Sequence, residues 1–280
     1  MKFGFIGGDL RYRYLKQMLE AEGHETAAYC CKFIDESTEL EKVLDGCHAV
    51  LGPIPCSRSG KTLALNDCSE IELSCFFEKM DKKSLFFAGA VSNSVRKAAG
   101  DIVVYDYFAL EDVAIKNAVP TAEGAVLTAI SESKQTIFGS NALVIGCGRC
   151  GKALALLLKG MGSNVTATCR KPEDGAYLNT LGLESLHISE LKDKIGAYSL
   201  IFNTVPAEIL GKDMLENADK NSMIIDIAQA PGGTDFIAAA ELGIKAFHCP
   251  GLPGRTAPYT AAEILKDAVL RLTLSHFDQN

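Results

Sequence analysis

Short apolar runs alternate with longer amphipathic segments through the first half of the chain. The apolar runs predict strands at residues 2–7, 26–31, 49–52, 85–89 and 102–105. The segments between them predict helices at residues 11–22, 37–44 and 69–80. Strands that alternate with helices in this way form a parallel sheet with helices on both faces.

The same alternation returns in the second half. Apolar runs predict strands at residues 142–146, 164–169, 200–204, 223–227 and 244–247. Helices are expected at residues 152–160, 173–181, 189–194 and 235–240, followed by a last amphipathic helix at 261–274. The predicted fold is therefore α/β, with two doubly wound, parallel-sheet, Rossmann-like domains joined by connecting helices.

Pro120 marks the boundary between the two halves. Thr121 can cap a helix that starts there, and the residues that follow carry an apolar face. We expect this helix, residues 120–134, to link the halves. The expected domains are a first domain at 1–118, completed by a C-terminal helix at 259–280, and a second domain at 119–258.

A glycine-rich turn follows the predicted strand at 142–146. Gly146, Gly148 and Gly151 form the pattern G-x-G-x-x-G, and an apolar helix and a second strand come next. This context is typical of a turn that holds the pyrophosphate of a dinucleotide. Gly146 allows the tight turn, Gly148 lets the backbone approach a phosphate, and Gly151 lets helix and strand pack closely. The helix N-terminus adds free N–H groups and the positive end of its dipole.

The end of the next predicted strand carries cations. An NAD site usually has Asp or Glu here, which binds the 2′-hydroxyl of the adenosine ribose. This chain has Arg170 and Lys171 instead. Because a guanidinium forms forked, charge-assisted hydrogen bonds with phosphate, NADP is the expected cofactor and NAD is the alternative. The other interpretation is that Arg170 is a solvated surface residue.

Further cofactor-binding residues are expected at the carboxyl ends of strands, where the ligands of open α/β sheets bind. The expected cofactor-binding set is Gly146, Gly148, Arg149, Cys150, Gly151, Arg170, Lys171, Asn203, Thr204, Val205, Pro206, Asp226 and Ala228. Cys147 and Cys150 form a C-x-x-C pattern that could be redox-active, but the glycine turn explains this segment without redox chemistry.

Composition excludes several classes of protein. With 280 residues, of which 48% are hydrophobic and 22% charged, the chain is an ordinary globular protein, and no apolar run is long enough to span a membrane. The net charge of −7 argues against nucleic acid as a main partner. The ten cysteines form no compact framework, and apart from that C-x-x-C no pair of Cys or His has zinc-ligand spacing, so a reduced, cytoplasmic protein without a metal site is expected.

A small anion pocket is expected in the first half. Gly7, Gly8 and Asp9 lie at a strand–helix junction, and Arg11 adds positive charge there. The alternative is an ordinary turn with a surface arginine. Arg58 follows another strand and could form a second wall. His248 comes after the last predicted strand and is a candidate catalytic residue, although a single histidine is more often structural.

Several motifs occur in the same order as in a known family. They are Gly7-Gly8-Asp9-x-Arg11, Asn117-Ala118-Val119-Pro120-Thr121-Ala122-Glu123-Gly124, the glycine turn, Asp226-Ile227-Ala228 with Pro231-Gly232-Gly233, and Pro250-Gly251-Leu252-Pro253-Gly254-Arg255-Thr256-Ala257-Pro258. Across nearly the whole chain they resemble the A subunits of dipicolinate synthase. The Pro-Thr-Ala-Glu-Gly and Gly-Leu-Pro-Gly segments carry most of this resemblance.

The resemblance implies NAD(P)-linked oxidation of a dihydrodipicolinate-level intermediate of lysine synthesis to dipicolinate. It also implies that the flavoprotein-like B subunit of dipicolinate synthase is a partner, in the mother cell of a sporulating bacterium, and a homo-oligomer is expected. The substrate would be a ring with two carboxylates, for which Arg11, Arg58 and Arg255 are candidate ligands. Glu123 could orient a ring proton or cap its helix at the third position.

Two other functions stay open on the sequence alone. The chain could be another two-domain dehydrogenase, of the alanine dehydrogenase or 2-hydroxyacid type, although Arg170 and Lys171 argue against the usual NAD preference of those enzymes. It could also be a nucleotide-binding subunit without turnover of its own.

Overall fold

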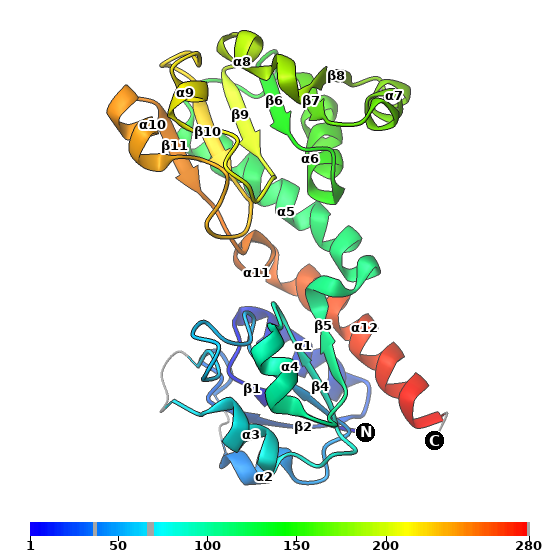
Figure 1. The fold of residues 1–280 in the computed structure, drawn as a ribbon. Coiled ribbons are helices and arrows are strands. Elements are labelled where there is room, and N and C mark those ends of the chain that lie inside the picture. The colour runs from blue at the N-terminus through cyan, green and yellow to red at the C-terminus, as the bar shows by residue number, and fades with distance from the viewer. Residues whose placement is uncertain (36–37, 66–69, 279–280) are drawn as a thin grey trace. The chain divides into compact units, whose positions relative to one another are not determined.

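Two parallel sheets organise the chain, and each belongs to a separate compact unit (Figure 1). The computed structural model describes residues 1–35, 38–65 and 70–278. Unit 1 comprises Met1–Lys116 and Ala257–Asn280, and unit 2 comprises Asn117–Thr256. The predicted fold class, an α/β protein with two doubly wound parallel sheets, is confirmed.

The sheet of unit 1 has the strand order β2-β1-β3-β4-β5, and all of its pairings are parallel. Its strands are β1 (Lys2–Ile6), β2 (Glu25–Tyr29), β3 (Ala49–Leu51), β4 (Leu85–Ala88) and β5 (Val104–Asp106). This order is flavodoxin-like, and the direction in which strands are added reverses between β1 and β3. The carboxyl ends of β1 and β3 are therefore where a ligand of this unit would bind.

Helices cover both faces of the sheet in unit 1. They are α1 (Leu10–Ala21), α2 (Leu40–Leu44), α3 (Leu73–Lys79), α4 (Asn93–Ala99) and α12 (Pro258–Asp278), with a 3-10 turn η1 (Tyr107–Ala109). Helices α1 and α12 pack side by side over Phe5 and Phe87. Helices α2, α3 and α4 cover the other face, over Ile6 and Phe86. Neighbouring residues of one strand, such as Phe5 and Ile6, thus serve two separate cores.

The sheet of unit 2 has the order β11-β10-β9-β6-β7-β8, again with parallel pairings throughout. Its strands are β6 (Asn141–Ile145), β7 (Asn164–Cys169), β8 (Glu184–His187), β9 (Leu200–Asn203), β10 (Met223–Asp226) and β11 (Lys245–His248). Counted from β6, this is the strand order of a dinucleotide-binding Rossmann domain, with its switch point between β6 and β9.

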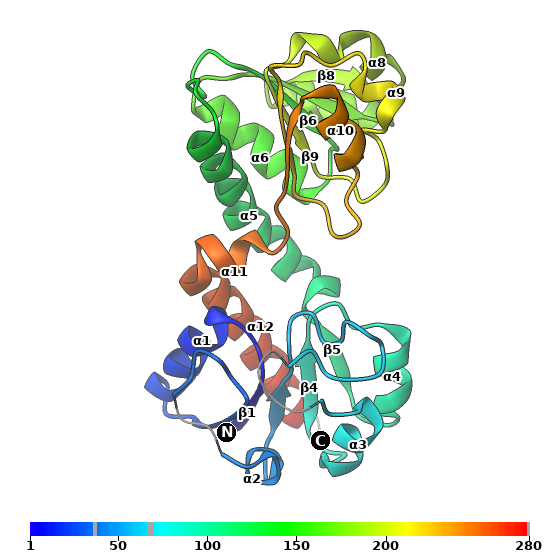
Figure 2. The ribbon, with the colours of Figure 1, turned by 90° about the vertical axis from the view of Figure 1, so that its left-hand side faces the viewer.

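Helices also cover both faces of the sheet in unit 2. They are α5 (Glu111–Glu132), α6 (Arg149–Gly160), α7 (Pro172–Thr180), α8 (Leu191–Lys194), α9 (Lys212–Leu215), α10 (Phe236–Leu242) and α11 (Leu252–Thr256), with 3-10 turns η2 (Ile188–Glu190) and η3 (Ile195–Ala197). Figure 2 shows α5 and α6 on one face of the sheet and α9 and α10 on the other. Along β6, Val144 faces the first layer and Ile145 the second.

The linking helix begins earlier than the sequence predicts. Helix α5 starts at Glu111, and Pro120 lies inside it. Pro120 has no N–H to donate to the preceding turn, which costs about 3 kcal/mol in a helix interior. Val113 is buried in the core of unit 1, and Ala118 and Ala122 are buried on either side of Pro120, so tertiary packing outweighs the break. The predicted helix at 120–134, capped by Thr121, is therefore wrong at its start.

Several short elements are absent from the sequence-based prediction. Strand β8 is one of them, because only Leu186 in it is buried and no apolar run marks it. Helices α4, α9 and α11 are also missing, and each has seven residues or fewer. Helix α6 begins at Arg149 rather than at residue 152. The predicted helix starts at residues 37 and 69 lie outside the described residues.

The thiols and the helices bear on two further expectations. Among the described residues, eight cysteines are free thiols: Cys31, Cys47, Cys56, Cys75, Cys147, Cys150, Cys169 and Cys249. Cys30 is disulfide-bonded, so the fully reduced set expected from the sequence does not hold there. Within the described ranges, no helix combines the length and the apolar character needed to cross a bilayer.

Candidate cofactor site

The turn between β6 and α6 is fixed by close backbone contacts. Gly146 has a φ of +108°, a conformation that other residues rarely adopt, and its N–H donates to Thr168 Oγ1 at 3.0 Å. A Cβ at Gly146 would lie 2.4 Å from Thr204 Oγ1, and one at Gly151 would lie 2.1 Å from the carbonyl oxygen of Gly146. The first and third glycines are therefore required by packing within the protein.

Gly148 has a different surrounding. A Cβ there would meet no atom within 4 Å, and Gly148 is the N-cap of α6. The first N–H groups of a helix have no partner within it, so those of α6 are directed at this open space. A group that needs close approach of backbone amides, such as a pyrophosphate, fits this space.

A pocket of about 380 Å³ extends from this turn. It is lined by Gly146, Cys147, Gly148, Thr168, Cys169, Arg170, Lys171, Asp174, Ile188, Thr204, Val205, Pro206 and Ile209. Most of these residues lie at or just after the carboxyl ends of β6, β7, β8 and β9, and β6 and β9 flank the switch point of the sheet. The size lies within the range of small-molecule and cofactor sites.

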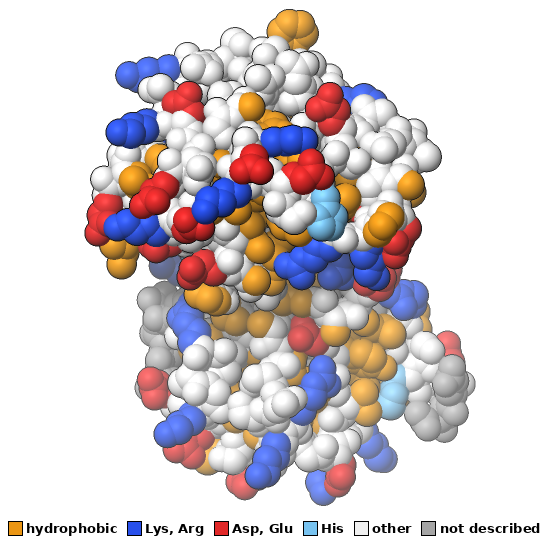
Figure 3. Space-filling view, turned by 45° about the horizontal axis from the view of Figure 1, so that its top comes forward, with side chains coloured by type: hydrophobic (Ala, Val, Ile, Leu, Met, Phe, Trp, Pro, Cys, Tyr) orange, Lys and Arg blue, Asp and Glu red, His pale blue; other side chains and the backbone are white. Residues whose placement is uncertain are grey.

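The end of the pocket at β7 is rich in charge. Arg170 and Lys171 are both exposed there, and Asp174 lies on the first turn of α7. The Arg170 side chain has no hydrogen-bond or ion-pair partner within the described part of the chain. Lys171 Nζ lies 4.0 Å from Glu173 Oε1, and both side chains are solvated. Elsewhere, on the face shown in Figure 3, basic and acidic side chains are interspersed rather than gathered into one field.

The structure brings together some of the predicted cofactor-binding residues and leaves others outside the pocket. Arg149, Cys150 and Gly151 form the first turn of α6, next to the lining residues. Burial raises the pKa of the Cys147 and Cys150 thiols, which disfavours the reactive thiolate in the C-x-x-C pattern.

Asn203 and Asp226 are fully buried and shape the backbone. Asn203 bonds to both the N–H and the carbonyl of Val205. Asp226 accepts hydrogen bonds from the N–H of Gly233 at 2.8 Å, the N–H of Ala228 at 3.0 Å and the hydroxyl of Thr234 at 2.8 Å. These side chains hold the loops after β9 and β10 and do not line the pocket, nor does Ala228.

Six residues that line the pocket were not predicted from the sequence. They are Cys147, Thr168, Cys169, Asp174, Ile188 and Ile209. Cys147 and Cys169 could have been predicted, because they lie next to predicted cofactor residues in the glycine turn and at the end of β7. Ile188 could not have been predicted in this way, because strand β8, which precedes it, was not predicted.

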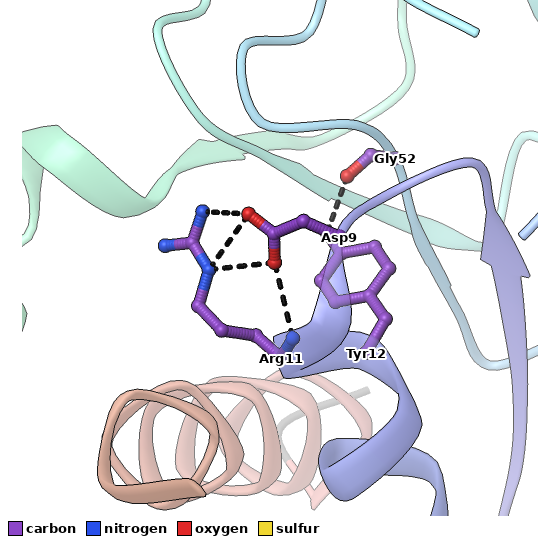
Figure 4. Close-up of polar contacts among 4 residues, drawn as sticks. All are labelled: Asp9, Arg11, Tyr12 and Gly52. Carbon is purple, nitrogen blue, oxygen red and sulfur yellow. Dashed lines mark hydrogen bonds and ion pairs between the residues drawn. The ribbon is translucent and has the colours of Figure 1, made fainter. Parts of the chain in front are cut away.

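Arg11 lies in unit 1 and is already paired. Its Nη2 lies 2.6 Å from Asp9 Oδ2, and its Nε donates to Asp9 Oδ1 at 2.9 Å (Figure 4). Asp9 also caps α1 by accepting the N–H of Arg11 at 3.1 Å. The Arg11 side chain is 7% exposed, and its Nη1 has no partner among the described residues. Tyr12, next in sequence, donates its hydroxyl to the carbonyl of Gly52.

The other predicted substrate and catalytic residues are exposed. Arg58 lies in the loop after β3, and Arg255 lies on α11. Glu123 lies in the middle of α5 and not at the third position of a helix, so its predicted capping role is wrong. His248 ends β11, and its Nε2 donates to the carbonyl of Ala228 at 3.1 Å.

Two of the motifs that carry the family resemblance meet in unit 2. Gly124 belongs to the Pro-Thr-Ala-Glu-Gly segment on α5, and Leu252 belongs to the Gly-Leu-Pro-Gly segment on α11. A Cβ at Gly124 would lie 2.9 Å from Leu252 Cβ, so α5 and α11 pack too closely for any larger residue.

Comparison with known proteins agrees with this architecture. The family model for the NAD binding domain of D-isomer specific 2-hydroxyacid dehydrogenases matches residues 117–232. The model for the N-terminal domain of the dipicolinate synthase A subunit matches residues 2–107. The fold and the pocket thus define an oxidoreductase with a domain for a nicotinamide dinucleotide.

Solved structures and a curated relative show the resemblance in more detail. The structure of the dipicolinate synthase A subunit from Bacillus halodurans has a TM-score of 0.89 and 28% identity, covering 97% of both chains. That of the dipicolinate synthase A chain from Bacillus subtilis has a TM-score of 0.89 and 27% identity, covering 100% of this chain and 98% of that one. The curated dipicolinate synthase A subunit of Bacillus subtilis (strain 168) is 39% identical over 165 residues, which span 59% of this chain and 56% of that relative. The predicted resemblance to the A subunits of dipicolinate synthase is therefore confirmed.

Proposed function

We propose that this chain catalyses NAD(P)-dependent oxidation of a dihydrodipicolinate-level intermediate to dipicolinate. In this reaction a hydride passes from a ring carbon of the substrate to the nicotinamide, a proton passes to a base, and the product ring is aromatic. The observation that carries the proposal is the similarity to dipicolinate synthase A subunits over both units, together with a pocket beside the glycine turn at the switch point of unit 2.

NADP is the proposed cofactor. Arg170 directly follows β7, where an NAD site usually has a carboxylate, and its guanidinium has no partner within the described residues. A 2′-phosphate would supply that partner through charge-assisted hydrogen bonds. The open space before Gly148 and the N-terminus of α6 would hold the pyrophosphate, and the loop after β9 would flank the nicotinamide ribose.

The substrate side of the proposal uses exposed cations and one histidine. Arg58 and Arg255 are exposed, and Arg11 keeps Nη1 for a carboxylate while Asp9 holds its other edge. His248 donates from Nε2, so its Nδ1 carries a lone pair that can accept the ring proton. Glu123, exposed on α5, is the alternative proton acceptor.

A partner and a setting complete the proposal. The relatives are named as one lettered subunit of dipicolinate synthase, which supports a second, different polypeptide as partner of this chain. We place the reaction in the cytoplasm of the mother cell of a sporulating bacterium, with this chain as a homo-oligomer that works together with the flavoprotein-like B subunit.

Product formation tests the reaction. The purified chain is incubated with the lysine-pathway intermediate and NADP⁺ or NAD⁺, with and without the B subunit, and dipicolinate and reduced cofactor are quantified. Formation of both in equal amounts supports the proposal. Product that requires the B subunit, yet forms without NADP⁺, would instead favour a subunit without turnover of its own. Reduction of pyruvate with NADPH or NADH would favour a 2-hydroxyacid or alanine-type dehydrogenase.

Cofactor choice is tested by Arg170→Ala. Since each lost charge-assisted hydrogen bond is worth about 1.5–3 kcal/mol, the dissociation constant for NADPH should rise roughly 10- to 100-fold, and that for NADH much less. The measurement is a fluorescence titration with each cofactor. Arg271→Ala is the matched control, because Arg271 is an exposed arginine of unit 1 that pairs with Asp112. Equal weakening of both cofactors by Arg170→Ala would contradict the NADP assignment.

A further inference from the structure

The backbone that carries Arg170 has few internal supports. Residue 170 lies between the end of β7 and the start of α7, outside both elements. Lys171, the N-cap of α7, makes no hydrogen bond with its side chain, and Pro172 at the first helical position has no N–H to give. The direction in which the Arg170 side chain leaves the turn therefore depends on contacts from other elements.

One such contact comes from His187 at the end of β8. Its Nε2 lies 3.2 Å from the carbonyl oxygen of Arg170, so Nε2 carries the proton and donates. On the opposite side of the ring, Nδ1 accepts the N–H of Ser189 at 3.4 Å and lies 2.7 Å from Ser189 Oγ. Contacts on both nitrogens fix the orientation of the ring and assign its tautomer.

The position of His187 joins two walls of the pocket. It pairs with Cys169 in the parallel register of β7 and β8, and it is followed directly by Ile188. Both Cys169 and Ile188 line the pocket, as does Arg170 itself, whereas His187 does not. His187 is exposed, lies outside the lining, and ties the turn with the cations to the wall that contains Ile188.

We propose that His187 is a positioning residue for cofactor choice: through its hydrogen bond to the Arg170 carbonyl, it holds the Arg170 guanidinium where a 2′-phosphate binds. This inference rests on the proposed NADP site. It differs from that site in one respect, since His187 makes no contact with the cofactor and acts only through the backbone of Arg170. Its loss should therefore affect NADP and leave NAD binding nearly unchanged.

The test uses His187→Ala and a conservative rescue variant. Loss of one neutral hydrogen bond corresponds to about a fivefold change, so His187→Ala should weaken NADPH about fivefold and NADH less than twofold. His187→Gln places an amide N–H near the position of Nε2 and should recover most of the NADPH affinity. Both variants are titrated with NADPH and NADH by calorimetry, and thermal unfolding is recorded for each.

The double variant Arg170→Ala/His187→Ala isolates the coupling. If His187 acts through Arg170, adding His187→Ala to Arg170→Ala changes the NADPH affinity by less than twofold. Equal weakening of both cofactors by His187→Ala, no rescue by Gln, or additive losses in the double variant would each overturn the positioning role. If Arg170→Ala still weakens NADPH more than NADH in that experiment, the proposed NADP site is retained and only the role of His187 is rejected. If Arg170→Ala itself leaves the ratio of the two affinities unchanged, both proposals fail.

Discussion

The three glycines of the turn after β6 serve different needs at the scale of single atoms. Gly151 has the backbone of Gly146 against it, because a Cβ would come within 2.1 Å of that carbonyl oxygen. Gly148 has open space where its side chain would be, and its φ of −78° suits any residue. Gly151 is therefore required for folding, whereas glycine at position 148 is required only if a ligand occupies the open space.

Alanine variants of these two glycines should therefore separate stability from binding. Gly151→Ala forces backbone apart and is expected to lower the free energy of unfolding by about 1–3 kcal/mol, as overpacking does. Gly148→Ala should leave the unfolding temperature unchanged and weaken NADPH at least about tenfold, by loss of close contacts worth more than about 1.4 kcal/mol. Thermal unfolding and fluorescence titration measure the two effects. A Gly148→Ala variant that binds NADPH like the parent would contradict the position assigned to the pyrophosphate.

Single residues also show where sequence reasoning about the site stops. Gly146, Gly148 and Arg170 could be predicted because each requirement is local: a turn, an open backbone, a charge after a strand. Asp226 also lies at the end of a strand, but its side chain points inward. Its carboxylate accepts hydrogen bonds from the N–H groups of Gly233 and Ala228. Arg11 likewise forms an ion pair with Asp9 within the protein. The position of a residue along a strand predicts the edge of the sheet at which it lies. The direction of its side chain depends on the hydrogen-bonding groups around it.

At the scale of elements, β7 supports the glycine turn from its neighbouring strand. Thr166 and Thr168 lie two residues apart on the same side of β7 and are both buried. Thr168 Oγ1 accepts the N–H of Gly146 at 3.0 Å, whereas Thr166 Oγ1 donates to the exposed Glu184 at 3.2 Å. The two hydroxyls have similar burial and unlike partners: one holds the turn, and the other meets a carboxylate that water can solvate.

Valine substitutions on β7 test this support. Thr168→Val keeps the shape of the side chain but leaves the Gly146 N–H without its acceptor, which should cost about 1 kcal/mol of stability and weaken NADPH several-fold. Thr166→Val is the matched control and should change NADPH affinity by less than twofold, since Glu184 can turn to water. Chemical denaturation and cofactor titration are the measurements. Equal effects of the two variants on NADPH binding would show that the Thr168 contact does not organise the turn.

Element prediction from the sequence succeeds where burial is regular and fails where it is sparse. The apolar runs of β1, β4, β6, β9 and β10 gave correct strands, because nearly every residue in them is buried. Strand β8 has a single buried residue, Leu186, and pairs with only one neighbour, β7. Helix α5 is the opposite case: local rules predict a break at Pro120, but the helix continues through it because of its tertiary packing. These outcomes depend on tertiary neighbours, which a local pattern does not contain.

At the scale of the whole molecule, the two units have separate cores and different buried chemistry. Unit 1 buries Tyr12 and Tyr107 completely, and burial raises the pKa of both hydroxyls. Burial also raises the pKa of Cys31 and Cys56 to about 12 and that of Cys47 to about 11. All of these groups are neutral in the folded protein, and they ionise at lower pH once the chain unfolds. Unit 1 therefore holds both shifted tyrosines and the three most strongly shifted thiols, so its stability should depend on alkaline pH.

The sign of that dependence follows from proton binding. Above a pH of about 9 for thiols and about 10 for tyrosines, the unfolded chain loses protons that the folded chain keeps, so the free energy of unfolding falls as pH rises. Each buried tyrosine should contribute a loss of about 1 kcal/mol between pH 10 and pH 11, because it is already half ionised in the unfolded chain at pH 10. Stability should be unaffected by these groups at pH 8, where both states hold their protons.

Tyr107→Phe tests this dependence because the Tyr107 hydroxyl is buried without a hydrogen-bond partner in the described chain. Removing an unsatisfied hydroxyl should leave unit 1 equally stable or up to about 1 kcal/mol more stable at pH 8, and should reduce the loss at pH 11. Tyr12→Phe is the control: it removes one titrating group as well, but it also removes the hydrogen bond to the Gly52 carbonyl and should cost about 1 kcal/mol at pH 8. Urea denaturation at both pH values, under reducing conditions and followed by tyrosine fluorescence and circular dichroism, gives the four free energies. If Tyr107→Phe destabilised the protein at pH 8 as much as Tyr12→Phe does, the hydroxyl would have a partner and its proposed share of the alkaline transition would be wrong.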